Sequence, residues 1–163
     1  MKKLSIIFGG TLFLALFFSL TAFKHVPPGG PSANGQGSLT LGGDQQRRFS
    51  FHANNMPDGS VQGSGVLTYT TGNLKIKFDI DCLSVSGNTA TMSGTITDVG
   101  GSNATAVVPG WKCWFKVKDN GEGSNASPDE MSLLFSAASL GNCGVPYSVA
   151  VFAIEGGNIQ VKP

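Results

Sequence analysis

The chain has 163 residues, 23 glycines and a formal net charge of +1, and charged residues make up only 13% of it. So weakly charged a chain lacks the basic footprint of nucleic-acid-binding proteins, and no nucleic acid is expected among its partners. Its length is that of one domain behind a short leader.

Residues 1–22 have the parts of a secretory signal peptide. Lys2 and Lys3 precede an apolar run, residues 4–20, and the small residues Thr21 and Ala22 follow it. This pattern predicts a secreted protein, periplasmic or extracellular, cleaved after Ala22. The run is also nearly long enough to span a bilayer, so an uncleaved anchor is the alternative and the expected site of any membrane contact.

Residues 23–37 are rich in Pro, Gly and Ser, which predicts a flexible spacer before an all-β domain at 38–163. In that domain, short segments with apolar residues at every second position alternate with turn residues, and no segment has helical periodicity. The segments expected to be strands are 38–41, 47–53, 61–70, 74–85, 89–97, 111–118, 131–137, 147–154 and 158–162. Short turns between neighbours favour an antiparallel, meandering β-barrel of about eight strands, with a β-sandwich as the alternative.

The central hairpin, residues 73–97, defines the inner and outer faces. Apolar residues occupy every second position from Leu74 to Cys82, which places Cys82 on the buried face. The parity then changes, because Leu83 is the next apolar residue, and a bulge near Cys82–Leu83 is expected.

The three cysteines, Cys82, Cys113 and Cys143, predict one disulfide and one free thiol in an exported chain. Cys113 shares its strand face with Phe115 and Val117, which suggests a buried free thiol. A Cys82–Cys143 bond would close a loop of 61 residues and stabilise the fold by roughly 4 kcal/mol. Spacing alone leaves the pairings Cys82–Cys113 and Cys113–Cys143 open.

Several short motifs together resemble a recurrent family of small secreted bacterial β-domains of unknown function. They are Asp58-Gly59-Ser60, the segment 82–90 (CLSVSGNTA), the segment 119–123 (DNGEG) and the segment 157–161 (GNIQV). The resemblance covers about residue 45 to the C-terminus and implies that Cys82 pairs with Cys143. Cys113 departs from the family, which more usually has another apolar residue there. The family has no known activity, so none is implied.

The polar loop 119–130 is a candidate for a metal site. Asp119, Glu122, Asp129 and Glu130 offer the hard oxygen ligands that calcium prefers. The spacing does not fit a helix-loop-helix calcium site, and the turn residues are explained by a solvated hairpin loop. No metal or cofactor is therefore expected, with calcium at these four residues as the alternative.

His52 is the only histidine within the domain, and it falls on the outer face of its strand. A Ser-His-Asp hydrolase would have to use it, yet no serine lies in a strand-to-helix elbow, and a zinc site needs more nitrogen or sulfur ligands. We therefore expect no catalytic residues.

The outward-facing Trp114, with Lys112 and Lys116 beside it, is a possible interaction surface unless a second layer covers it.

These patterns favour a secreted, non-catalytic β-domain that binds a ligand or a surface polymer, or contributes to an extracellular surface. The alternative is a barrel that carries a small apolar ligand within its interior. The inward-facing residues that would then line the cavity are Phe49, Phe51, Tyr69, Phe78, Trp111 and Phe115.

Overall fold

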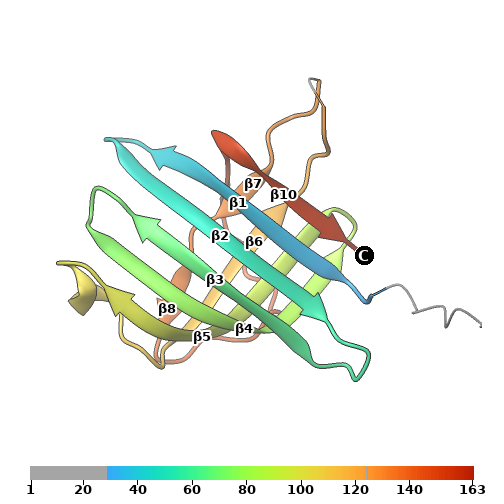
Figure 1. The fold of residues 1–163 in the computed structure, drawn as a ribbon, viewed down its shortest axis with the longest axis horizontal. Coiled ribbons are helices and arrows are strands. Elements are labelled where there is room, and N and C mark those ends of the chain that lie inside the picture. The colour runs from blue at the N-terminus through green and yellow to red at the C-terminus, as the bar shows by residue number, and fades with distance from the viewer. Residues whose placement is uncertain (1–28, 124) are drawn as a thin grey trace, which may run out of the picture.

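The computed structural model describes residues 29–123 and 125–163 and confirms an all-β fold (Figure 1). The described residues form ten strands and one 3-10 turn, Ala104–Ala106. The strands are β1 (Ser32–Leu41), β2 (Gln45–Asn55), β3 (Val61–Tyr69), β4 (Leu74–Ser86), β5 (Thr89–Gly100), β6 (Lys112–Lys118), β7 (Glu130–Ser132), β8 (Phe135–Ala137), β9 (Val151–Ala153) and β10 (Gly156–Lys162). The predicted signal peptide, 1–22, lies outside the described residues.

All ten strands belong to one antiparallel sheet with the order β10-β1-β2-β3-β4-β5-β6-β7-β9, and β8 pairs with β6. Strands β1 to β6 follow the chain as a meander, and the sheet curls into a barrel that stays open (Figure 1). The last strand, β10, returns to pair with β1. The meandering barrel is thus confirmed, with a seam between β10 and the edge formed by β7 and β9.

The predicted spacer is too long, because β1 begins at Ser32 and not after residue 37. Composition suggested a segment with nothing to bury, but the backbone of β1 pairs with both β2 and β10. Its glycines make room for rings from β2: a Cβ on Gly35 would lie 2.9 Å from the Phe51 ring, and one on Gly37 would lie 3.0 Å from Phe49. A glycine-rich strand is stable here because its neighbours supply the apolar side chains.

The interior is filled by phenylalanine rings placed beside glycines. One cross-strand row runs through Gly35, Phe51, Gly65 and Phe78, and a Cβ on Gly65 would lie 2.3 Å from the Phe78 ring. From β6, Phe115 packs edge-to-face on Phe51 and on Phe78, with centroids 5.4 and 5.6 Å apart. These contacts occupy the centre of the barrel.

Two of the later strand predictions are wrong. Residues 131–137 do not form one strand, because the chain breaks at Leu133 and Leu134 and Phe135 then pairs with Trp114 on the outer face. Of the predicted strand 147–154, only Val151–Ala153 is extended in the sheet. The residues before β9 run outside the barrel, so their apolar side chains form a second layer over the outer face of the sheet.

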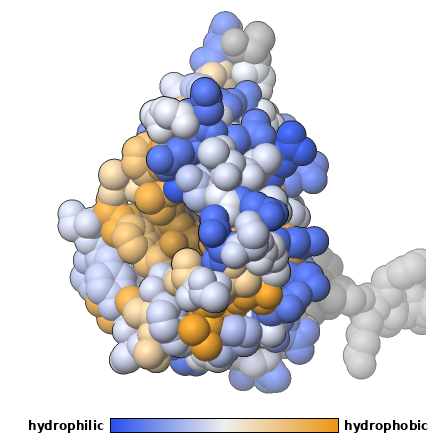
Figure 2. All heavy atoms as spheres, turned by 90° about the vertical axis from the view of Figure 1, so that its left-hand side faces the viewer, coloured by the Kyte–Doolittle hydropathy of each residue, from blue (hydrophilic) through white to orange (hydrophobic). Residues whose placement is uncertain are grey.

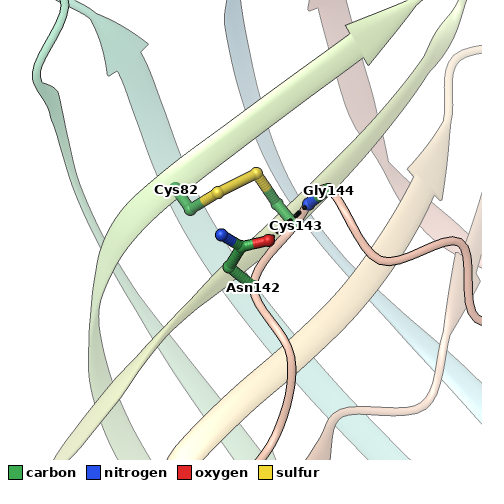
Figure 3. Close-up of a disulfide and its surroundings, with 4 residues drawn as sticks. All are labelled: Cys82, Asn142, Cys143 and Gly144. Carbon is green, nitrogen blue, oxygen red and sulfur yellow. Dashed lines mark hydrogen bonds between the residues drawn. A yellow bond between two sulfur atoms is a disulfide. The ribbon is translucent and has the colours of Figure 1, made fainter.

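We call that outer segment, residues 138–150, the strap. Figure 3 shows that the disulfide between Cys82 and Cys143 ties it to β4. The register of β4 on β5 shifts between Ile80 and Cys82, so the bulge precedes Cys82 and turns its side chain outward. The predicted pairing is confirmed, whereas the placement of Cys82 on the buried face is wrong. Cys113 pairs with Gly94 on the inner face, remains free and is fully buried, as expected.

Candidate functional site

Two carboxylates of the predicted calcium loop accept backbone hydrogen bonds across the open seam of the barrel. Asp129 is buried, and its Oδ2 accepts a hydrogen bond from the backbone N–H of Ile159 at 2.7 Å. Its Oδ1 accepts from the N–H of Asn120 at 2.8 Å. Asp119 makes the same kind of contact, accepting from the N–H of Val161 at 3.0 Å and of Gly121 at 2.8 Å. Both Ile159 and Val161 lie on β10, so carboxylates replace a strand partner there.

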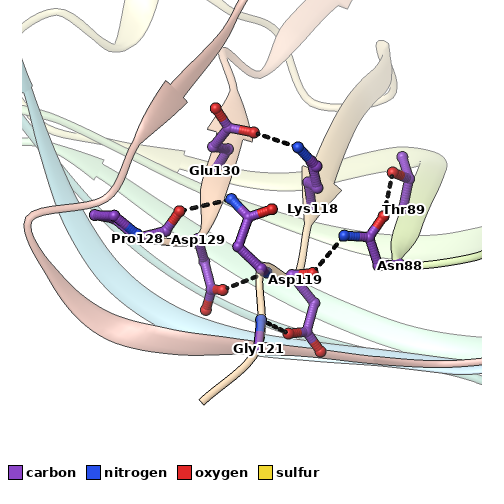
Figure 4. Close-up of polar contacts among 9 residues, drawn as sticks. Asn88, Thr89, Lys118, Asp119, Gly121, Pro128, Asp129 and Glu130 are labelled. Carbon is purple, nitrogen blue, oxygen red and sulfur yellow. Dashed lines mark hydrogen bonds and ion pairs between the residues drawn. The ribbon is translucent and has the colours of Figure 1, made fainter. Parts of the chain in front are cut away.

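The other two residues of that set are engaged separately. Glu122 accepts hydrogen bonds from the side-chain amides of Asn158 and Gln160. Glu130 pairs with Lys118 at 3.3 Å, as Figure 4 shows beside Asp119 and Asp129. Across residues 29–123 and 125–163, no group of three His, Cys, Asp or Glu side chains is arranged to hold a metal ion. The structure therefore does not bring the four predicted ligands together.

His52 is exposed on β2, where the residues opposite it are Asn34 and Ser64. The outward orientation of His52 is confirmed, and no acidic residue is paired with it in the sheet. The expectation that the protein is not an enzyme stays a prediction.

The Trp114 surface is covered by a second layer, which is the alternative that the sequence left open. Its side chain is only 1% exposed, because the strap lies over the outer face of β5 and β6. The Trp114 ring packs edge-to-face on Tyr147 of the strap at 5.1 Å and on Phe135 at 6.2 Å. In the sheet register, Cys82, Ser93, Trp114 and Phe135 form one outer row. We call these four residues, with Cys143 and Tyr147, the outer cluster.

The two lysines predicted beside Trp114 differ in their contacts. Lys112 donates to the hydroxyl of Thr95 at 2.8 Å and lies 3.8 Å from the Asp81 carboxylate. Lys116 lies 5.8 Å from the Trp114 ring centroid and 3.5 Å from the backbone oxygen of Tyr147. Trp114 and Lys116 thus belong to the contact between the sheet and the strap, which the Cys82–Cys143 disulfide ties to β4. The contacts of Lys112 are with its neighbours in the sheet.

A different apolar surface remains open at one end of the barrel, which we call the mouth. The ends of β1, β3 and β5 and the starts of β2 and β4 meet there. The innermost row at this end consists of Leu39, Arg47, Tyr69 and Leu74, paired across four strands. Figure 2 views this end of the molecule and shows apolar atoms gathered in a hollow. The partly buried apolar residues at this end of the core are Leu41, Leu74, Val99, Trp111 and Leu134.

A hollow of about 380 Å³ lies at the rim of the mouth, between the turn after β3 and the end of β5. Tyr69, Leu74 and Lys75 are among its lining residues. The Tyr69 ring also packs closely on Gly72, where a Cβ would lie 2.2 Å from it. The turn therefore fixes the ring at the rim.

Arg47 is the charged residue within the mouth. Its guanidinium stacks over the Tyr69 ring at 4.6 Å from the centroid, and Nη1 donates to the backbone oxygen of Gln45 at 3.1 Å. Sequence reasoning did not single it out, although it has the same parity as Phe49 and Phe51 and so must face inward. That parity was the available signal.

The six residues predicted to line an internal cavity divide into two groups. Phe49, Phe51, Phe78 and Phe115 are at most 5% exposed and pack on one another, whereas Tyr69 and Trp111 are partly exposed near the mouth. A ligand would therefore find its apolar contacts at the end of the barrel and not at its centre.

Comparisons with known proteins give no relative to set beside this site. No family model matches the chain, and neither the curated proteins nor the solved structures contain a match. The resemblance to small secreted bacterial β-domains thus stays a prediction. Among the described residues, no helix is long and apolar enough to cross a bilayer.

Proposed function

We propose that the protein is a non-catalytic binding domain outside the cytoplasm and that its ligand contacts the mouth. The observation that supports this most is the difference between two apolar surfaces. Trp114 in the outer cluster is buried beneath the strap, which a disulfide ties to the sheet, whereas Tyr69 and Leu74 line an open hollow at the mouth and Trp111 is partly exposed. Figure 2 shows apolar atoms gathered at this end of the molecule. Open apolar hollows of this kind are typical of binding sites.

The disulfide is compatible with the oxidising compartment that this function requires. Export itself is tested by the mass of the native protein, purified from its source with and without reductant. We expect a mass that lacks residues 1–22 and rises by two hydrogens on reduction. A mass that includes residues 1–22 would favour an anchored protein.

Binding at the mouth is tested with Nile red, a neutral apolar dye, by fluorescence titration. We expect saturable binding that weakens about tenfold or more in Trp111→Ala and in Leu74→Ser, since each removes more than about 1.4 kcal/mol of apolar contact. The matched control is Val145→Ser, which changes an exposed apolar residue on the strap.

The control should bind the dye as the native protein does. Dye binding that is equally strong in all four proteins, or none in the native protein, would contradict the proposal. Circular dichroism melts of each variant separate a lost contact from a lost fold.

A further inference from the structure

We infer that the mouth binds a monomeric amphiphile with an anionic head group and a single apolar chain, and that Arg47 receives the head group. This inference rests on the proposed function and adds the chemical class of the ligand. Three features of the described residues carry it, namely the unused hydrogen-bond donors of Arg47, the sign of the charge around the hollow, and the shape of the apolar surface.

Arg47 uses only part of its hydrogen-bonding capacity. A guanidinium has five N–H donors in a planar fork. The contacts that it makes are with Gln45, at 3.1 Å to the backbone oxygen and at 3.5 Å to the side-chain oxygen. Stacking on Tyr69 fixes the plane of the fork without using a donor. Donors therefore remain for a ligand.

The charge near Arg47 is not neutralised by the protein. Among residues 29–123 and 125–163, no carboxylate lies within 4.0 Å of its guanidinium. The hollow at the rim is lined by the Tyr69 ring on which Arg47 stacks, by Lys75 and by no acidic residue. Asp98 of β5 is paired with Lys77 at 2.8 Å, and Asp44, three residues before Arg47, is exposed in the turn between β1 and β2. A partly buried arginine in apolar surroundings attracts an anion, which it can bind in a bidentate manner.

The apolar part of the mouth has the size of a site for one small ligand. The interior below it is closed by the rings of Phe51, Phe78 and Phe115, so a chain lies across the mouth and not along the barrel axis. The hollow of about 380 Å³ is at the small end of ligand sites. Concave surfaces of this size suit small molecules.

The test is isothermal titration calorimetry of the native protein at pH 8 with three ligands of equal chain length. The two ionic ligands are kept below their critical micelle concentrations and the neutral one below its solubility limit. The ligands are dodecanoate, dodecanol and dodecyltrimethylammonium. We expect dodecanoate to bind about tenfold or more tightly than dodecanol, and the cation to bind most weakly. The variant Arg47→Gln should bind dodecanoate and dodecanol alike.

Arg48→Gln is the matched control, because Arg48 is the next residue of β2, carries the same charge and is exposed on the opposite face. It should keep the preference for dodecanoate. Arg47→Lys, which retains the charge but not the fork, should keep part of it. Equal losses in Arg47→Gln and Arg48→Gln would mean a diffuse charge effect and would overturn the inference.

The outcomes separate this inference from the proposed function. If dodecanoate and dodecanol bind equally well, and Trp111→Ala binds neither, the head-group assignment is overturned and the mouth remains the binding site. No binding of any ligand would count against both. Binding to vesicles of anionic phospholipid but to no monomeric ligand would overturn the inference in favour of a membrane surface.

Discussion

The two tryptophans of the β6 region, three residues apart, end in different surroundings. Trp114 faces outward from the barrel and is almost fully buried, while Trp111 faces inward and is partly exposed. Strand alternation assigns them to opposite faces, but it does not determine which face is covered. In an open barrel, the outer face can be closed by a second layer and the inner face can reach solvent at the mouth.

The difference between the two tryptophans distinguishes the outer cluster, which stabilises the fold, from the mouth, which is the candidate binding site. A disulfide and the Trp114–Tyr147 ring contact hold the strap over the outer cluster. At the mouth, the apolar residues surround an arginine that has no carboxylate partner among the described residues. Substitutions in the outer cluster should therefore affect stability, and those at the mouth should affect binding.

The largest difference is expected between alanine substitutions of the two tryptophans. Trp114→Ala should lower the free energy of unfolding by about 3 to 5 kcal/mol, because it leaves a cavity beneath the strap. Trp111→Ala should cost less than about 2 kcal/mol, since its ring is partly exposed. Guanidinium unfolding curves measure both. Equal costs would break the distinction between cluster and mouth.

Trp114→Phe sharpens the same comparison. Within the described residues, the buried Nε1 of Trp114 has no hydrogen-bond acceptor. Phenylalanine removes that unpaired donor and keeps an aromatic ring, so it should cost clearly less than alanine.

The second effect concerns the disulfide. The double variant Cys82→Ser/Cys143→Ser should lose about 2 to 4 kcal/mol, because the bond closes a loop of 61 residues. It should also raise acrylamide quenching of Trp114, since the strap is no longer tied to β4. A variant as stable as the native protein, with quenching unchanged, would show that the strap is held without the bond.

A smaller effect is expected at the seam. Asp129→Asn should cost about 1 to 3 kcal/mol, because an amide can no longer accept from both the Ile159 and the Asn120 N–H groups. Asp44→Asn, at an exposed turn, is the control and should be nearly neutral. Hydrogen exchange of the β10 amides measures whether the seam opens more often in Asp129→Asn, in which case their exchange should be faster. Unchanged exchange in Asp129→Asn would contradict the role given to this carboxylate.

The smallest expected effect concerns the reactivity of the Cys113 thiol and its contribution to stability at high pH. Burial, together with the Asp81 charge, raises the pKa of its thiol to about 12. At pH 8 roughly one thiol in ten thousand is then ionised in the folded protein, so Ellman's reagent should react only after unfolding. Because the folded-state pKa is raised, this thiol favours folding below its ordinary pKa, and that contribution declines above about pH 9. Fast reaction of the native protein would show that Cys113 is accessible.

Most strands of the sheet could be predicted from the sequence. Alternation predicts β2 to β5 to within a few residues, because a half-buried strand with one wet face has a strong period of two. It failed at β1, where glycines carry no pattern and rings from Phe49 and Phe51 fill the space instead. It also failed after Ser132, where a break and a disulfide-tied strap replace regular pairing.

Less of the candidate site could be predicted from the sequence. The side chains of Asp119 and Asp129 look like metal ligands in a loop, and only the return of β10 shows that they accept its backbone N–H groups. Arg47 could have been assigned to the inner face by parity. Its lack of a carboxylate partner depends on strand order and register, which no local pattern contains.

The most direct test uses the two tryptophans as reporters. Trp114→Phe leaves only Trp111, at the mouth, and Trp111→Phe leaves only Trp114, beneath the strap. On titration with dodecanoate, we predict a saturable blue shift of emission in the first variant and no change in the second. A shift of Trp114 emission with Trp111 unaffected, or no shift in either, would contradict the assignment of the mouth as the binding surface.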